Sequence, residues 1–144
     1  MFDLNRFITA HEGNYERALR ELRAGHKKSH WIWFIFPQEA HLGVSAQSKY
    51  YGISGTEEAQ AYMAHPVLGS HYLECVDALL EHRRRPIVEI MGTNLDAKKL
   101  LSSLTLMSNA CGKGTIHEAI SAFYGDSDWE EDQRLAAKCQ AGNF

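Results

Sequence analysis

Cysteine and proline are scarce in this sequence, and no apolar run is long. The three cysteines, Cys75, Cys111 and Cys139, lie far apart and form no CxxC motif. An odd number of scattered cysteines excludes a disulfide framework and favours free thiols in a reducing cytoplasm. The longest apolar run, residues 31–37, is too short to cross a bilayer, and the first residues lack the pattern of a signal peptide. We therefore expect a cytoplasmic protein that does not associate with membranes.

An excess of positive charge is absent as well. The chain carries 15 Lys and Arg residues against 18 Asp and Glu residues, a formal net charge of −3. This balance predicts no binding to nucleic acid or to an anionic membrane. The apolar fraction of 44% and the charged fraction of 23% are ordinary globular values and exclude disorder as the main state. The 144 residues fit one domain, which we expect to cover residues 1–144.

Helical periodicity dominates the chain. Apolar residues recur three or four positions apart from Leu4 to Leu22, with Asp3 as a candidate N-cap, Gly25 as a stop and Gly13 as a candidate break. The same reasoning predicts further helices, two of them opened by capping boxes at Ser54–Glu57 and Thr115–Glu118, over residues 31–36, 45–51, 56–64, 66–82, 94–111, 115–125 and a last segment after Ser127.

Only residues 31–36 have the composition of a buried strand, and no second such run exists to pair with them in a sheet. The sequence therefore predicts an all-α fold. We expect a single domain of about seven short helices, arranged as a compact bundle or a small right-handed helical array.

The most unusual stretch is KSHWIWFIFPQ, residues 28–38, which combines aromatic side chains with one histidine and one glutamine. A ligand pocket needs apolar walls and a few convergent polar groups, and aromatic faces can stack on a flat ring. The same composition is typical of a core helix with polar ends, so two interpretations stay open. If the stretch forms a pocket, its ligand-binding residues are His30, Trp31, Trp33, Phe34 and Gln38.

Other patterns that carry chemistry are incomplete. His26 and His30 are four residues apart, but they follow a helix stop and have no carboxylate partner or HExxH motif. The hydroxyls of residues 102–105 lack a GxSxG context. We therefore predict no metal site, no cofactor and no identifiable catalytic residue. Two basic clusters, residues 17–28 and 83–85, would bind an anion or an acidic partner if the fold brought them together.

Several strings of the sequence resemble one protein family. They are the Ser-His-Trp to Phe-Pro-Gln string at residues 29–38, His-Pro-Val-Leu-Gly at residues 65–69, and the segment 99–106. On these strings the chain resembles the DUF1810 family over nearly its whole length. The resemblance implies a single, mostly helical, intracellular domain, and it assigns no activity and no catalytic residue. One departure is that His11 stands where glutamine is usual.

Three classes of function are compatible with these observations. The preferred one is a small-molecule or nucleotide-type binding domain, whose ligand would be a small anionic or aromatic metabolite. The second is a helical module that binds a protein partner and no small ligand. The third is a hydrolase on a nucleotide-like substrate with His30 as general base, which requires an acidic residue within hydrogen-bond reach of His30. The sequence leaves open whether the protein is an enzyme and what its oligomeric state is.

Overall fold

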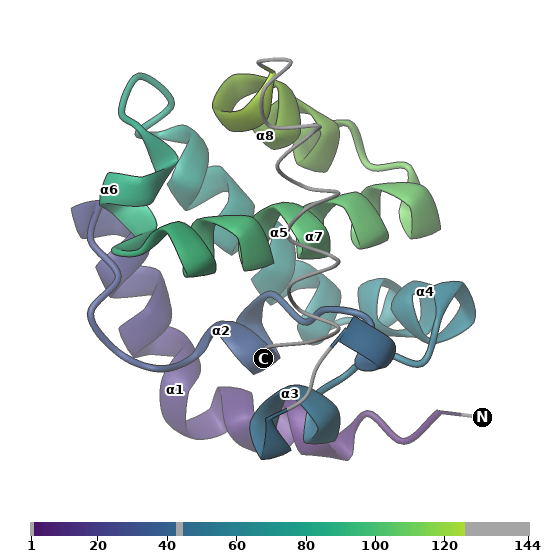
Figure 1. The fold of residues 1–144 in the computed structure, drawn as a ribbon. Helices are drawn as coiled ribbons and strands as arrows, with labels where there is room; N and C mark the ends of the chain where they lie inside the picture. Colours follow the sequence, from purple (N-terminus) through teal and green to yellow (C-terminus); the bar gives the residue numbers. More distant parts are fainter. Residues whose placement is uncertain (1, 43–44, 126–144) are drawn as a thin grey trace.

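The computed structural model describes residues 2–42 and 45–125, and this part of the chain is all-α (Figure 1). Its β structure is limited to one isolated bridge between Glu39 and Ile53. The elements are α1 (Asn5–Ala24), α2 (Ile32–Ile35), η1 (Ala40–Leu42), α3 (Ala46–Tyr50), α4 (Thr56–Ala64), α5 (Leu68–Leu80), α6 (Ile87–Met91), α7 (Asn94–Cys111) and α8 (Gly114–Tyr124). The expected all-α fold is confirmed. No helix in these ranges is both long and apolar enough to span a membrane.

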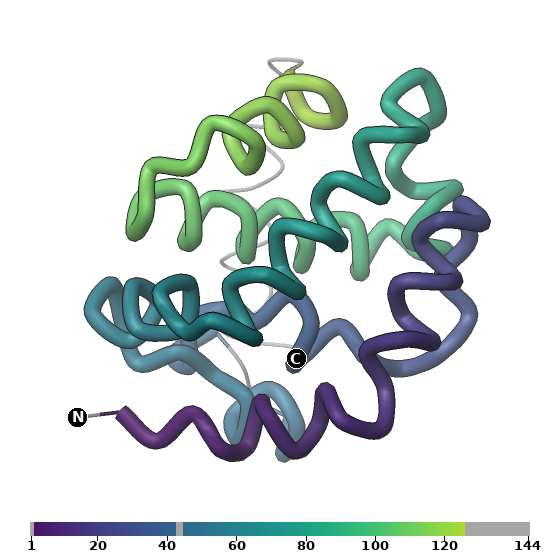
Figure 2. The backbone as a smooth tube through the Cα atoms, turned by 180° about the vertical axis from the view of Figure 1, so that it is seen from behind, coloured from purple at the N-terminus to yellow at the C-terminus, as the bar shows by residue number. Residues whose placement is uncertain are grey.

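The three longest helices, α1, α5 and α7, organise the fold. The helix α5 packs against α1, α4 and α8, while α7 packs against α4, α6 and α8. The short helix α2 lies against both α1 and α7, so the aromatic segment reaches the centre of the molecule (Figures 1 and 2). Their apolar faces form one shared core, as expected for a compact bundle.

Helix α1 and the start of α4 differ from the expectation. The N-cap of α1 is Leu4, without a side-chain hydrogen bond, and not Asp3. Helix α1 continues through Gly13, which costs little at one exposed position because neighbouring turns bury their apolar residues. No side chain caps the start of α4; the expected capping box is wrong. Instead, the buried carboxylate of Glu58 accepts from the N–H of Ser54 (2.7 Å) and from the guanidinium of Arg6 (3.1 Å). This pair ties α1 to the start of α4.

Helix α7 covers the predicted range 94–111, whereas the start of α8 differs from the expectation. The N-cap of α7 is Thr93, whose hydroxyl accepts from the N–H of Asp96 at 3.0 Å. Helix α8 begins at Gly114 without a side-chain cap, so the predicted capping box at Thr115 is wrong. The stop at Gly112 has the left-handed conformation that glycine favours, with φ 64°. The helix expected after Ser127, together with Cys139, lies outside the described residues; Cys75 and Cys111 are free thiols.

The aromatic segment forms the middle of the core. Trp31 is 1% exposed, Phe36 is fully buried, and the Phe36 ring meets the edge of Tyr72 at a centroid distance of 5.4 Å. Large aromatic side chains contribute the most apolar area per residue to a core. The loop that leads into this segment is anchored to α1 by the contacts of Glu21.

The carboxylate of Glu21 binds the loop that leads into α2. It accepts from the N–H of Lys28 (2.7 Å), the N–H of Ser29 (2.9 Å), the hydroxyl of Ser29 (2.6 Å) and the indole N–H of Trp31 (2.9 Å). Burial acts to raise the pKa of Glu21, but these hydrogen bonds outweigh it and lower the pKa to about 2. The Lys-Ser-His-Trp string therefore forms a loop that binds one carboxylate of α1.

The His-Pro-Val-Leu-Gly string has an equally local explanation. The imidazole Nδ1 of His65 accepts from the N–H groups of Val67 (3.1 Å) and Leu68 (3.2 Å), which have no partner inside α5. A Cβ at Gly69 would stand 2.1 Å from the carbonyl oxygen of Met63. Only glycine lets the first turn of α5 approach the end of α4 this closely.

Replacing Glu21 by Gln is expected to lower the free energy of unfolding by about 2 kcal/mol, because the amide presents N–H groups to N–H donors and loses the charge-assisted bonds. Urea unfolding at pH 7 measures the change. Glu16→Gln, an exposed position on the same helix, is the matched control and should stay within about 0.5 kcal/mol of the parent. Equal stability of the two variants would show that Glu21 does not anchor the loop.

Candidate functional site

The five ligand-binding residues predicted from the sequence do not meet in one cavity. Trp31 and Phe34 are core residues, Trp33 and Gln38 are half-buried, and His30 is exposed. The cavity that Trp33 and Gln38 line together has a volume of about 10 Å³, room for one water molecule at most. The structure thus uses most of this segment as core, and ligand binding by the five residues stays a prediction.

The two basic clusters do come together, at the ends of α1 and α5. The imidazole Nε2 of His82 lies 2.9 Å from the carbonyl oxygen of Arg23. Three cations of this end are already paired, in Arg23–Glu74, Lys27–Asp96 and Arg83–Glu118. In the described ranges no group of three His, Cys, Asp or Glu side chains could hold a metal ion.

A groove between α1 and the start of α5 is the better candidate site. It has a volume of about 420 Å³ and is lined by Ile8, His11, Glu12, Tyr15, Glu16, Val67 and His71. The α1 residues recur at helical spacing, so they share one side of the helix. We call this space the α1–α5 groove. Small-molecule sites typically have volumes of this order.

Two histidines meet at the floor of the α1–α5 groove. His11 is 4% exposed, and its Nδ1 lies 2.9 Å from Nδ1 of His71. The Nε2 of His11 lies 2.8 Å from the carbonyl oxygen of Phe34. That oxygen belongs to the last turn of α2, where helix carbonyls lack internal partners. The hydroxyl of Tyr62 donates to the same oxygen at 3.1 Å.

This geometry determines where the protons sit on both rings. A carbonyl oxygen only accepts, so Nε2 of His11 carries a hydrogen and donates to Phe34. In neutral His11 the Nδ1 then accepts, and His71 must donate through its own Nδ1–H. The Nε2 of neutral His71 is left as a lone-pair acceptor, and it has no hydrogen-bond partner in the part of the chain that the structure describes.

The ring of His71 is also held by stacking. Tyr15 lies parallel to it, with a centroid distance of 3.5 Å and an interplanar angle of 5°. Tyr15 is 9% exposed, and its buried hydroxyl makes no hydrogen bond of normal geometry with a described residue. Burial, followed by the nearby carboxylate of Glu74, raises the pKa of Tyr15, so the phenol stays neutral. The orientation of His71 is therefore fixed before any ligand arrives.

Both histidines are neutral at pH 7. Burial is the main cause that lowers the pKa of His11 from 6.5 to about 4, against the opposing hydrogen bond to Phe34. Burial likewise lowers the pKa of His71, with Glu74 acting in the opposite direction. A second proton on His11 would also need the Nδ1 that already accepts from His71, so geometry and burial favour the same state.

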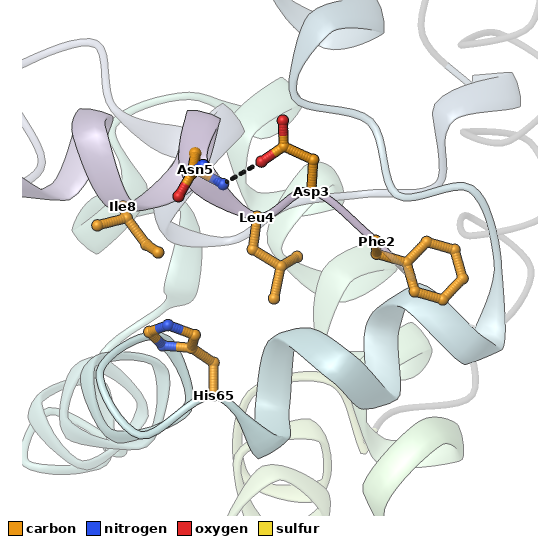
Figure 3. Close-up of a pocket in the computed structure, with 6 residues that line it drawn as sticks. All are labelled: Phe2, Asp3, Leu4, Asn5, Ile8 and His65. Atoms are coloured by element: carbon orange, nitrogen blue, oxygen red, sulfur yellow. Dashed lines mark hydrogen bonds between the residues drawn. The ribbon is translucent and has the colours of Figure 1, made fainter.

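A second pocket of about 450 Å³ adjoins the groove and shares Ile8 with it. Its other lining residues are Phe2, Asp3, Leu4, Asn5 and His65 (Figure 3). The His65 ring points from the end of α4 toward Ile8 on α1 and toward Leu4, the residue before α1 (Figure 3). Since Nδ1 of His65 accepts from backbone N–H groups, its Nε2 carries the hydrogen and presents a donor to this pocket.

The sequence interpretation missed His11, Tyr15 and His71 as site residues. His11 and Tyr15 fit the apolar face of the first helix and therefore looked like core. His71 is 60 residues from His11, and no sequence spacing indicates that the two rings meet. Phe34 is the predicted site residue that contacts the new site, through its carbonyl oxygen and through its ring, which lies 6.5 Å from the His11 ring between centroids.

The comparisons with known proteins agree with the fold. The model of the DUF1810 family, described as a protein of unknown function, matches residues 1–135. The crystal structure of the conserved hypothetical protein Rv1873 from Mycobacterium tuberculosis is 40% identical, with a TM-score of 0.84 over 93% of this chain and 96% of that one. Among curated proteins, none matches.

The stability of the protein should fall in mild acid because His11 must gain a proton on unfolding. Its folded pKa of about 4 lies below the ordinary 6.5, so the unfolded state binds more protons. The contribution is complete above pH 6.5 and is lost as the pH falls toward 4, by up to about 3 kcal/mol. Urea unfolding across this range measures the loss.

His11→Gln is the matched variant. A glutamine amide can donate to Phe34 and accept from His71, but it does not titrate. We expect its stability to decline less than that of the parent between pH 6.5 and 4. Identical pH profiles would contradict the assignment of the acid-sensitive step to His11.

Proposed function

The chain belongs to the DUF1810 family, and we propose that it binds a small organic molecule in the α1–α5 groove through a hydrogen bond to Nε2 of His71. The observation that carries this proposal is the hydrogen-bond chain from Phe34 through His11 to His71. It leaves one acceptor of fixed direction on a side chain that lines a groove of ligand size.

The site is preorganised, which lowers the cost of binding. Tyr15 stacks on one face of His71, and His11 holds the ring plane through Nδ1. A ligand therefore pays little to order the protein side of the contact. Ile8 and Val67 supply apolar area beside the polar edge, and Val67 is 43% exposed in the free protein. Polar direction and apolar area together are what small-molecule sites combine.

The hydrolase that the sequence also allowed has less support. His30 is exposed on the loop before α2 and makes no ion pair with an acidic residue of the described ranges. A general base needs a partner that orients the ring and stabilises its charged form. His71 has an orienting partner in His11, whereas the exposed imidazole of His30 has no hydrogen-bond or ion-pair partner among the described residues.

Thermal unfolding against a panel of amines, nucleosides and aromatic metabolites tests the proposal. A ligand at 100 times its Kd stabilises the fold by about 2.7 kcal/mol, which for this size raises Tm by about 5–10 °C. His71→Phe keeps a flat ring on Tyr15 but removes the acceptor, and the shift should disappear.

His30→Ala and Gln38→Ala are the controls, because they remove the polar groups of the site expected from the sequence and leave the α1–α5 groove intact. Both should keep the Tm shift of the parent. A shift that survives in His71→Phe and vanishes in His30→Ala would place the ligand at the aromatic segment and overturn the proposal.

A further inference from the structure

The charged groups that line the α1–α5 groove are all of one sign. Glu12 and Glu16 are exposed at its edge, and no lysine or arginine is among the lining residues. Neither carboxylate makes an ion pair with a described residue. Arg17, the residue after Glu16, donates instead to the amide oxygen of Asn14, and Arg20, one turn after Glu16, makes no ion pair with a described residue. The groove therefore presents two uncompensated carboxylates four residues apart on one helix, a spacing at which like charges repel.

The uncharged polar group of the groove is an acceptor too. His71 contributes the lone pair of Nε2, because its Nδ1–H is used by His11. An anionic ligand would face two carboxylates and a lone pair, whereas an N–H cation would find complementary partners at all three.

From this arrangement we infer that the ligand of the α1–α5 groove is an organic ammonium ion with at least one N–H and an apolar or aromatic body. The inference rests on the proposed function and names its ligand class. The N–H donates to Nε2 of His71, the positive charge is balanced by Glu12 and Glu16, and the apolar body covers Ile8 and Val67. The anionic metabolite expected from the sequence is the opposite charge class, so one experiment separates the two.

A charge series on one body provides the test. The probes are 2-phenylethylammonium, 2-phenylethanol, phenylacetate and the quaternary 2-phenylethyl-trimethylammonium, each titrated at millimolar concentration into the full chain. The readout is the ¹⁵N chemical shift of the imidazole nitrogens of His71. We expect 2-phenylethylammonium to bind about tenfold or more tightly than phenylacetate. The quaternary ion, which has no N–H to donate, should bind more weakly than the primary one.

The double variant Glu12→Gln/Glu16→Gln tests the charge term alone. It should lose most of the preference for 2-phenylethylammonium over 2-phenylethanol and keep the binding of the alcohol. Glu57→Gln/Glu81→Gln changes the same net charge at exposed positions away from the groove and should keep the preference. All four replaced residues are exposed, and Tm values confirm that both variants fold.

The outcomes separate the ligand class from the site. If 2-phenylethanol or phenylacetate perturbs His71 as strongly as the ammonium, the ligand class is wrong and the proposed function stands. If none of the four probes perturbs His71, the ligand class and the proposed function are both overturned. A preference for the ammonium that persists unchanged in Glu12→Gln/Glu16→Gln would overturn the role of the two carboxylates.

Discussion

The arrangement of the whole site depends on the hydrogen bonds that Glu21 receives from the loop before α2. One carboxylate on α1 satisfies two backbone N–H groups, one hydroxyl and the Trp31 indole. This places the first residue of the aromatic segment against α1, and the remaining residues of α2 follow into the core. The last turn of α2 then presents the carbonyl oxygen of Phe34 to His11 on the same helix. The anchoring of the loop and the orientation of the site therefore both depend on side chains of α1.

The His11–His71 pair shows how a buried polar contact can serve more than packing. Burying a neutral imidazole is acceptable only when its donor and its acceptor are both used, and Phe34 and His71 use them. As a consequence, the hydrogen-bond chain fixes the direction of one acceptor, Nε2 of His71. His71 lines the α1–α5 groove. A glutamine at position 11 offers the same donor and acceptor pair, so the hydrogen-bond chain does not require an imidazole there.

Much of the fold follows from local sequence patterns. The apolar spacing of residues 4–22 predicts α1, and Gly25 predicts its end, because a left-handed residue closes the helix there. The capping boxes predicted at Ser54 and Thr115 were both wrong, since neither α4 nor α8 has a side-chain cap. The N-cap of α4 is Gly55 and not Ser54, so Glu58 and not Glu57 stands at the N3 position, and its carboxylate binds Arg6 and the N–H of Ser54.

The sequence by itself determined the all-α class and most helix ranges, since periodicity and composition act within a few residues. It left open whether the aromatic segment is core or pocket, and the tertiary structure places most of it in the core. It did not determine the site. His11 and His71 belong to helices far apart in the chain. The sequence pattern of an apolar helix face does not show whether the face packs against leucine or against a second imidazole. Only the packing of α1 against α5 decides which ring nitrogens meet, and therefore which one remains available to a ligand.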